Sequence, residues 1–302
     1  MEHFSKIKEI INSDSDLSGI RELINNIRFE ITTDTSGNVI IHSKNNDINA
    51  SKIMICTVYN TNNLLIKKIN DNKAEFEKDT ETSSAAINDK EVFVGKESIG
   101  IIRSEYKDDK ISKQYIELWK DISVETGDCC SVKTNIDCKA NTLYGNNFDS
   151  VIPLQPMVSA INKAEECVNE LYFTLSISEK SLKALACEIK PDYIFLIKTT
   201  EATEEFKISD GCGIVYKDGC AVTAKNLRDV MLSAAKQSDV SFQPYIGRCT
   251  TLAEALSITG KGAFVGGIYI PVEHQKTSCQ IADVNDINSA ENLLINLINN
   301  NF

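Results

Sequence analysis

The sequence predicts an α/β protein whose main sheet is largely parallel and covered by helices on both faces, with a smaller β unit inserted into it. Three observations lead to this fold class. Several short runs are almost continuously apolar, as strands buried on both faces are. Helical patterns separate these runs, and such alternation is typical of a parallel sheet between two helical layers. One long segment, 66–146, has short alternating runs and no long helical pattern.

The elements follow in order along the chain. In residues 1–30, isoleucine and leucine recur at helical spacing around a polar segment at 14–19, which predicts two helices joined by a turn. A turn is expected at 34–38, and a strand begins at Val39. Further strands are predicted at 52–56, 171–177, 193–197, 263–265 and 268–270, and helices at 154–169, 181–188, 225–237 and 287–299.

The segment 66–146 is predicted to be a small antiparallel β unit. It is rich in charged and β-branched residues, and turns such as the one at 69–72 separate its short alternating runs. We therefore expect an α/β domain formed by residues 1–65 and 147–302, with an inserted β domain at 66–146.

Composition narrows the classes of function. The net charge of −11 argues against nucleic acid and against an anionic membrane as partners, because phosphate binding needs a basic surface. No apolar run approaches the roughly 20 residues of a membrane span, and residues 1–20 lack a signal-peptide pattern. A cytoplasmic location is expected. The ten scattered cysteines have no CxxC spacing, so most are expected to be free thiols.

Five pieces of sequence occur in the order found in a known enzyme family. They are Ser18-Gly19 with Arg21-Glu22, the turn at 34–38, the strand and polar segment at 52–66, the glycine-rich piece at 210–214 with Phe242-Gln243, and the strand at 267–271. Together they resemble metallopeptidase family 42, which includes TET aminopeptidases, glutamyl aminopeptidases, FrvX-like proteins and proteins historically labelled endoglucanases. The resemblance implies a zinc-exopeptidase-like mixed sheet with helices on both faces, plus an inserted β-barrel-like domain.

Enzymes of that family hold two divalent metals, zinc or cobalt, with two imidazoles and three carboxylates. A further carboxylate acts as general base on the metal-bound water. Carried over by position, the first imidazole falls at Val58 and its orienting carboxylate at Asn60. Valine has no lone pair for a cation, and a neutral amide is a poor substitute for a carboxylate. The bridging aspartate is kept as Asp149.

The remaining positions carry mostly lysine. The resemblance places the general base at Glu179 and the metal-binding glutamate beside it at Lys180. The next aspartate falls at Lys198. The final imidazole falls at Lys276, or at Gln275 if the register shifts by one residue. One of the five ligands therefore survives.

The histidines of the chain do not restore the missing metal ligands. The chain has three, His3, His42 and His274, and no shift of register brings two imidazoles and three carboxylates to the expected positions. His274 lies two residues from the last ligand position. It is either a ligand or a solvated loop residue.

The lysines suggest a reason for the losses. A carboxylate pocket without metal would bury uncompensated negative charge, and ammonium groups could pair with Asp149 and Glu179 instead. Three interpretations remain open. The lysines only neutralise a relic pocket, or their charge binds a small anion such as a carboxylate or phosphate, or else the mapping is wrong or the protein has an unusual one-metal or metal-free activity. Glu179 could also serve only as the cap of the helix that follows it, and Asp149 only to cap or stabilise the segment leading into 154–169.

The leading hypothesis is an aminopeptidase-like protein that has lost its dinuclear site and has no cofactor. Its role would be non-catalytic or regulatory, as a homo-oligomer, as a partner of an active paralogue, or as a binder of a peptide or small anion. The alternative is an active aminopeptidase that releases N-terminal residues from peptides with two divalent metals. The two hypotheses differ in metal content and in peptidase activity.

Overall fold

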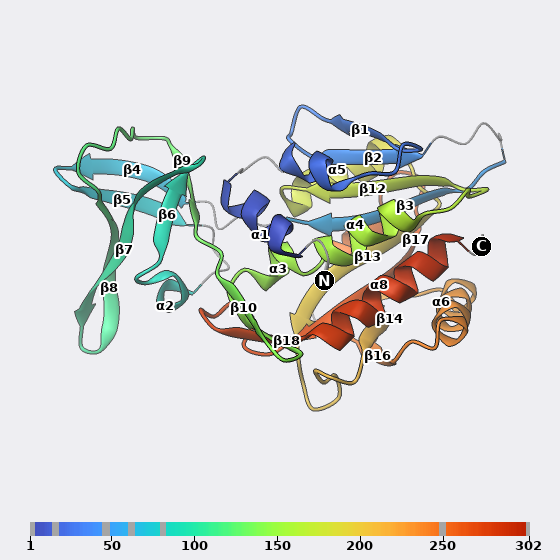
Figure 1. Cartoon of the computed structure of the whole chain (residues 1–302). Helices are drawn as coiled ribbons and strands as arrows, with labels where there is room; N and C mark the ends of the chain where they lie inside the picture. The colour runs from blue at the N-terminus through green and yellow to red at the C-terminus, as the bar shows by residue number, and fades with distance from the viewer. Residues whose placement is uncertain are drawn as a thin grey trace.

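The computed structural model describes residues 4–13, 18–43, 49–59, 64–78, 83–247 and 252–299. Within these ranges a nine-stranded mixed sheet forms the centre of the larger part of the molecule, in the order β1-β2-β12-β3-β13-β17-β14-β15, with β16 beside β14 (Figure 1). Its strands are β1 (Glu30–Thr33), β2 (Val39–Ser43), β3 (Lys52–Val58), β12 (Glu170–Ser176), β13 (Tyr193–Glu201), β14 (Cys212–Asp218), β15 (Ala221–Val222), β16 (Phe242–Ile246) and β17 (Phe264–Val272).

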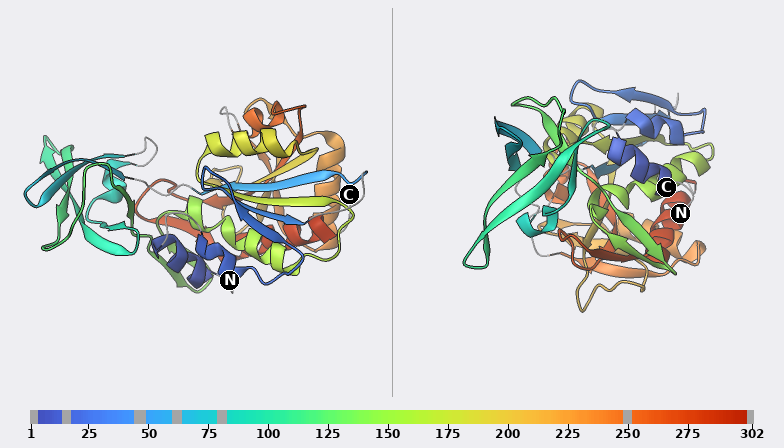
Figure 2. Two further views of the ribbon diagram at one scale, coloured as in Figure 1. Left: turned by 90° about the horizontal axis from the view of Figure 1, so that it is seen from above. Right: turned by 60° about the vertical axis from the view of Figure 1, so that its left-hand side comes forward.

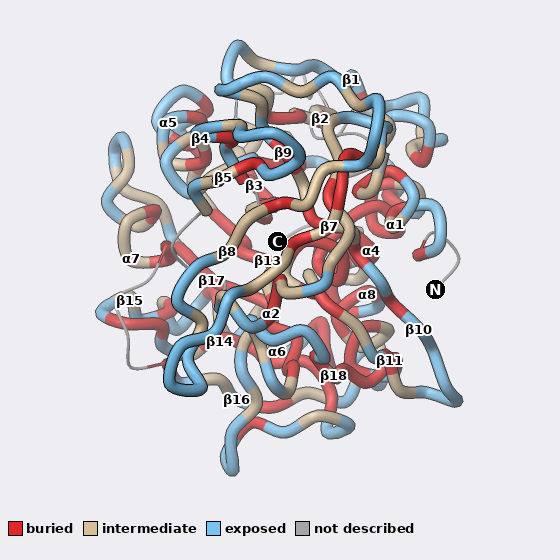
Figure 3. Tube along the Cα trace, turned by 90° about the vertical axis from the view of Figure 1, so that its left-hand side faces the viewer, coloured by how far each residue is buried: buried red, intermediate tan, exposed pale blue. Residues whose placement is uncertain are grey.

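The four central strands, β12, β3, β13 and β17, run parallel to one another. They correspond to near-continuous apolar runs of the sequence, and most of their residues are buried (Figure 3). Because neighbouring residues of a strand point to opposite faces, both faces of these strands are covered. The predicted runs at 263–265 and 268–270 form one strand, β17, because Gly266 and Gly267 continue it. A Cβ on Gly267 would lie 2.7 Å from the Tyr269 ring, so a side chain does not fit there. The pairs β1–β2, β2–β12 and β14–β17 are antiparallel, which makes the sheet mixed.

Helices cover both faces of this sheet, as predicted. One layer contains α1 (Phe4–Ser13), η1 (Ser18–Leu23), α3 (Phe148–Val151), α4 (Leu154–Lys163), α6 (Lys225–Gln237) and α8 (Val284–Asn299). The opposite layer contains α5 (Glu179–Ile189) and α7 (Leu252–Ser257) (Figure 2). Each layer has its own buried apolar cluster against the sheet. Side chains on the two faces of a central strand therefore pack into two different clusters.

The predicted β unit is a closed antiparallel barrel beside the large sheet (Figure 1). Its strands are β4 (Leu64–Asn70), β5 (Lys73–Lys78), β6 (Glu91–Val94), β7 (Glu97–Lys107), β8 (Lys110–Leu118) and β9 (Cys129–Val132), with the short helix α2 (Ser84–Ile87). A separate hydrophobic cluster fills it. After the barrel, β10 (Ile136–Lys139) pairs with β11 (Thr142–Gly145), and β11 pairs with β18 (Gln280–Asp283), which gives a separate three-stranded sheet. The domain boundaries proposed at 65/66 and 146/147 remain predictions.

The parallel strands β3, β12, β13 and β17 all end at the same side of the sheet, which we call the carboxyl edge. Val58 lies opposite Ser176 there, and Glu201 lies opposite Val272. Because the segments that follow these strands meet at this edge, the fold brings together parts of the chain that are far apart in sequence.

Candidate functional site

The turn that best resembles the family is tied to the carboxyl edge. Asp34 Oδ1 accepts hydrogen bonds from the backbone N–H groups of Ser36 (2.8 Å) and Asn38 (2.9 Å). Gly37 has a φ of 86°, which favours glycine. The buried Asn38 side chain in turn accepts a hydrogen bond from the N–H of Ile177, directly after β12. The pattern at 34–38 therefore positions the chain at the end of a central strand.

The position expected to hold the first imidazole is apolar. Val58 is the last residue of β3, is half-buried and packs against the cluster beneath α5 and α7. The next residue, Tyr59, is buried, and its N–H donates to the Ser176 carbonyl at 2.7 Å. Asn60, the position of the orienting carboxylate, lies outside the described residues.

Asp149 is held by two neutral side chains. Its Oδ1 accepts a hydrogen bond from the Thr199 hydroxyl (2.5 Å) and another from the Gln275 amide (2.8 Å). The carboxylate therefore joins α3, β13 and the turn between β17 and β18. Of the two positions considered for the final imidazole, Gln275 is the one that contacts Asp149.

A second carboxylate fixes the turn that presents Gln275. Glu201, at the end of β13, accepts the backbone N–H of His274 (3.1 Å) and that of Gln275 (2.7 Å). His274 and Lys276 have φ values of 56° and 64°, a region that costs non-glycine residues about 1–2 kcal/mol each. Both of these side chains are exposed. The turn therefore directs Gln275 toward Asp149.

Lys198 has a different partner from the ones considered in the sequence. Its ammonium group lies 3.2 Å from Asp218 Oδ2, so the predicted pairing with Asp149 or Glu179 is wrong for this lysine. The reason is the alternation of side chains along β13. Thr199 faces Asp149, and Lys198 therefore faces the opposite side of the sheet.

Glu179 and Lys180 are the first two residues of α5, and both are exposed. The helix cap is Ser178, whose Oγ accepts the Ser181 N–H at 3.1 Å, so the interpretation of Glu179 as the cap is wrong. A carboxylate in the first turn still interacts favourably with the helix dipole. Asp149 belongs to the opposite helical layer.

The residues at these positions do not fit a dinuclear metal centre. Such a centre needs several anionic or imidazole donors around two dications. The positions assigned by the resemblance instead carry Val58, Asp149, Lys180, Lys198, and Lys276 or Gln275. In the part of the chain that the structure describes, no three His, Cys, Asp or Glu side chains are grouped so that they could hold a metal ion.

Sequence reasoning missed several polar residues of this region. They are Thr199, Glu201, Asp218 and Tyr269, together with Asp286 in the first turn of α8. For Thr199, the only indication in the sequence is the alternation of side chains along a strand. That indication becomes useful once the burial of the neighbouring residues is known. Asp218 and Tyr269 contact Lys198 from β14 and β17, and no local pattern indicates that contact.

Asp286 holds the loop between β13 and β14. Its two carboxylate oxygens accept the backbone N–H groups of Ser209 (2.8 Å) and Gly211 (2.7 Å). Burial raises the pKa of Asp286 to about 7, and the nearby carboxylates of Asp283 and Asp210 act in the same direction. The loop after β13 is thus attached to a group that titrates near neutral pH.

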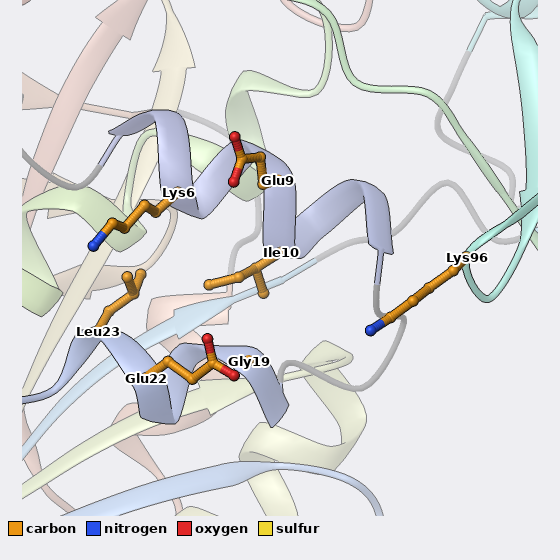
Figure 4. A pocket seen from close by; sticks show the side chains of 7 residues that line it. All are labelled: Lys6, Glu9, Ile10, Gly19, Glu22, Leu23 and Lys96. Carbon is orange, nitrogen blue, oxygen red and sulfur yellow. The ribbon is translucent and has the colours of Figure 1, made fainter.

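A separate cavity of about 320 Å³ lies between α1, η1 and the β6–β7 turn of the barrel (Figure 4). Its charged lining residues are Lys6, Glu9, Glu22 and Lys96. The two positive and two negative side chains give it no net preference for an anion or a cation. None of the lining residues belongs to the carboxyl edge.

The comparisons with known proteins agree with this fold. The sequence model of the M42 glutamyl aminopeptidase family matches residues 37–293. A putative aminopeptidase of Acetivibrio thermocellus is 24% identical over 225 residues, which are 66% of this chain and 68% of that protein. None of the described helices is long and apolar enough to cross a membrane.

Two solved structures have the same fold over nearly the whole chain. The aminopeptidase APDkam598 of Desulfurococcus kamchatkensis has a TM-score of 0.85 at 19% identity, covering 98% of this chain and 94% of that one. The TET1 peptidase of Pyrococcus horikoshii, described as assembling into a tetrahedron or a large octahedral shell, has a TM-score of 0.81 at 18% identity and covers 99% and 98%. The family match, which spans most of the sequence, establishes that the chain belongs to the M42 glutamyl aminopeptidase family.

Proposed function

We propose that this M42-family protein has lost the dinuclear metal site and acts as a non-catalytic or regulatory aminopeptidase-like paralogue. The observation that carries the proposal is the environment of Asp149. Its Oδ1 accepts hydrogen bonds from Thr199 and Gln275. These neutral donors contact one oxygen of a carboxylate that would bridge two metals in an enzyme of this family.

The proposed loss of metal also removes the means to activate water. Bulk water has a pKa of about 15.7, whereas zinc-bound water has a pKa of about 7. A carboxylate such as Glu179 therefore cannot generate hydroxide at neutral pH without a metal. Its exposed position in the first turn of α5 supports a role in helix stability instead.

Any ligand of the proposed pocket would be a peptide or a small anion. Lys180, His274 and Lys276 are exposed after the carboxyl ends of the central strands, and their side chains are suited to carboxylate or phosphate. Lys198 contributes little to such a site, because Asp218 compensates its charge. We further propose a cytoplasmic location and association with further copies of this chain or with an active paralogue.

The second candidate function is an active metal-dependent aminopeptidase. Family membership and the relative named as a putative aminopeptidase favour it. In that case Asp149 and Glu179 would act with two divalent metals, and the contacts of Thr199 and Gln275 would have to rearrange. Metal content separates the two candidates.

The test is the metal content per chain, measured by elemental mass spectrometry after incubation with zinc or cobalt and desalting. We expect close to zero metal per chain and no release of N-terminal residues from peptides. About two metals per chain would overturn the proposal, as would a peptidase activity that Glu179→Gln abolishes. The Glu179→Gln protein is the control for contaminating peptidases, because it differs by one exposed side chain.

A further inference from the structure

A cavity lies where the helical layer that contains α1 meets the barrel. It is bounded by α1, by η1 and by the turn between β6 and β7 (Figure 4). Its volume of about 320 Å³ falls within the roughly 300–1,000 Å³ of cavities that bind small molecules. Such sites occur preferentially between separate structural units. The cavity therefore has the size and the place of a small-molecule site.

Charged groups of both signs surround the cavity. Lys6 and Glu9 come from α1, Glu22 comes from η1, and Lys96 comes from the β6–β7 turn. All four are exposed, and in the described part of the chain none of their side chains forms a hydrogen bond or an ion pair. A simple anion or a simple cation would meet as many like charges as opposite ones. The arrangement therefore favours a molecule that carries both charges.

The cavity also has an apolar wall. In Figure 4, the side chains of Ile10 and Leu23 lie between α1 and η1. They are 9% and 3% exposed, and both belong to the apolar cluster of this helical layer. A ligand with an apolar part would remove the rest of their surface from water, which is favourable. An inorganic ion would leave that surface in contact with water.

The two helical walls are fixed before any ligand binds. Asn12, in α1, donates to the Thr134 carbonyl (3.0 Å) and accepts the Thr134 N–H (2.7 Å), which ties α1 to the segment after the barrel. Asn162, in α4, donates to the Leu23 carbonyl (2.8 Å) and accepts the Asn25 N–H (2.8 Å), which ties down the end of η1. Because ordering a mobile wall reduces affinity, these hydrogen bonds favour binding.

We propose that this cavity binds a small zwitterion, a molecule with an ammonium group, a carboxylate and an apolar part. A free amino acid and a short peptide share this chemistry. Glu9 and Glu22 pair with the ammonium group, Lys6 and Lys96 pair with the carboxylate, and the apolar part covers the apolar wall. Because Lys96 belongs to the barrel, the bound zwitterion links the barrel to α1 and η1. The site lies away from the carboxyl edge, so the proposal does not depend on metal content or activity.

The experiment is a titration of the isotope-labelled full chain with leucine and with leucyl-leucine, followed through the amide signals in NMR spectra. We expect saturable shifts at Gly19 and Lys96, which line the cavity. N-acetyl-leucine lacks the ammonium group and leucine amide lacks the carboxylate, so each should bind about twofold to fivefold more weakly than leucine. Tighter binding of leucine identifies a free amino acid as the ligand class, and tighter binding of leucyl-leucine identifies a short peptide.

Two variants assign the charges. Lys96→Met should weaken the binding of leucine about twofold to fivefold and leave that of leucine amide unchanged, because leucine amide has no carboxylate. Glu22→Gln should weaken leucine to a similar extent and leave N-acetyl-leucine unchanged. Lys107→Met is the matched control, since it removes an exposed lysine at the end of β7 in the same barrel and should not change the affinity. Urea unfolding checks that each variant is folded.

The proposal is refuted if neither leucine nor leucyl-leucine binds saturably at millimolar concentrations. It is also refuted if Lys96→Met and Glu22→Gln leave the affinity for leucine unchanged, or if Lys107→Met weakens it as much as Lys96→Met does. Binding that Lys180→Met abolishes, with no shift at Gly19, would place the ligand at the carboxyl edge. That result would refute the cavity site and support the pocket in the proposed function, so the two proposals are tested separately.

Discussion

Replacing Gln275 by alanine removes the amide that donates to Asp149 Oδ1 over 2.8 Å, together with weaker contacts to Thr199. A hydrogen bond to a charged acceptor contributes about 1.5–3 kcal/mol to stability. Because Asp149 and Gln275 are only half-buried, we take the lower value and expect a loss of about 1.5 kcal/mol. For a chain of this size, the loss corresponds to a fall in Tm of about 2–3 °C.

The assay is urea unfolding of Gln275→Ala, Asp149→Asn and the double variant. Because the two side chains share a hydrogen bond, we expect a coupling free energy of about 1 kcal/mol between them. Gln114→Ala is the matched control. This glutamine donates to Ser84 and Ser104 in the barrel, and its loss should add to Asp149→Asn without coupling.

Two results would refute this reasoning. The first is a stability of Gln275→Ala within about 0.5 kcal/mol of the wild type, which would mean that the amide contributes little to the fold. The second is a Tm of the wild type that rises when zinc or cobalt is added. Metal would then compete successfully with Thr199 and Gln275 for Asp149.

Two further predictions concern the loops at the carboxyl edge. The pKa of Asp286 is about 7 in the fold and about 3.9 when unfolded, so the folded state binds more protons between these values. Stability should therefore fall as the pH rises from about 4 to about 7. Tm measured across this range should fall less steeply with pH in Asp286→Asn than in the wild type. An unchanged slope would contradict the raised pKa of Asp286. Glu201→Gln leaves one acceptor for the N–H groups of His274 and Gln275, so we expect a loss of about 1 kcal/mol in urea unfolding. If the turn between β17 and β18 were held in another way, the coupling free energy between Glu201→Gln and Gln275→Ala would be zero.

Much of the fold follows from patterns within short stretches of sequence. The apolar runs at 52–56 and 193–197 correspond to β3 and β13, and the helical pattern at 225–237 coincides with α6. The charged alternating segment 66–146 covers most of the barrel, although β4 begins at Leu64 and the segment also holds β10 and β11, which lie outside the barrel. A buried strand gives a run of apolar residues, and a helix with one buried face gives apolar residues at helical spacing. Both patterns can be recognised in a short stretch of sequence.

The contacts at the carboxyl edge depend on which face of each strand meets which helical layer. Asp149 and Gln275 are 126 positions apart, and Lys198 and Asp218 are 20 positions apart on strands that are not neighbours. In β13, a shift of one residue would put Lys198 in the place of Thr199 as the partner of Asp149. The sequence alone predicted, through the family resemblance, that most metal-ligand positions carry other residues, and this stays a prediction. Only the tertiary structure decided that neutral donors contact Asp149 and that Lys198 pairs with a buried carboxylate, because packing sets the register and orientation of each strand.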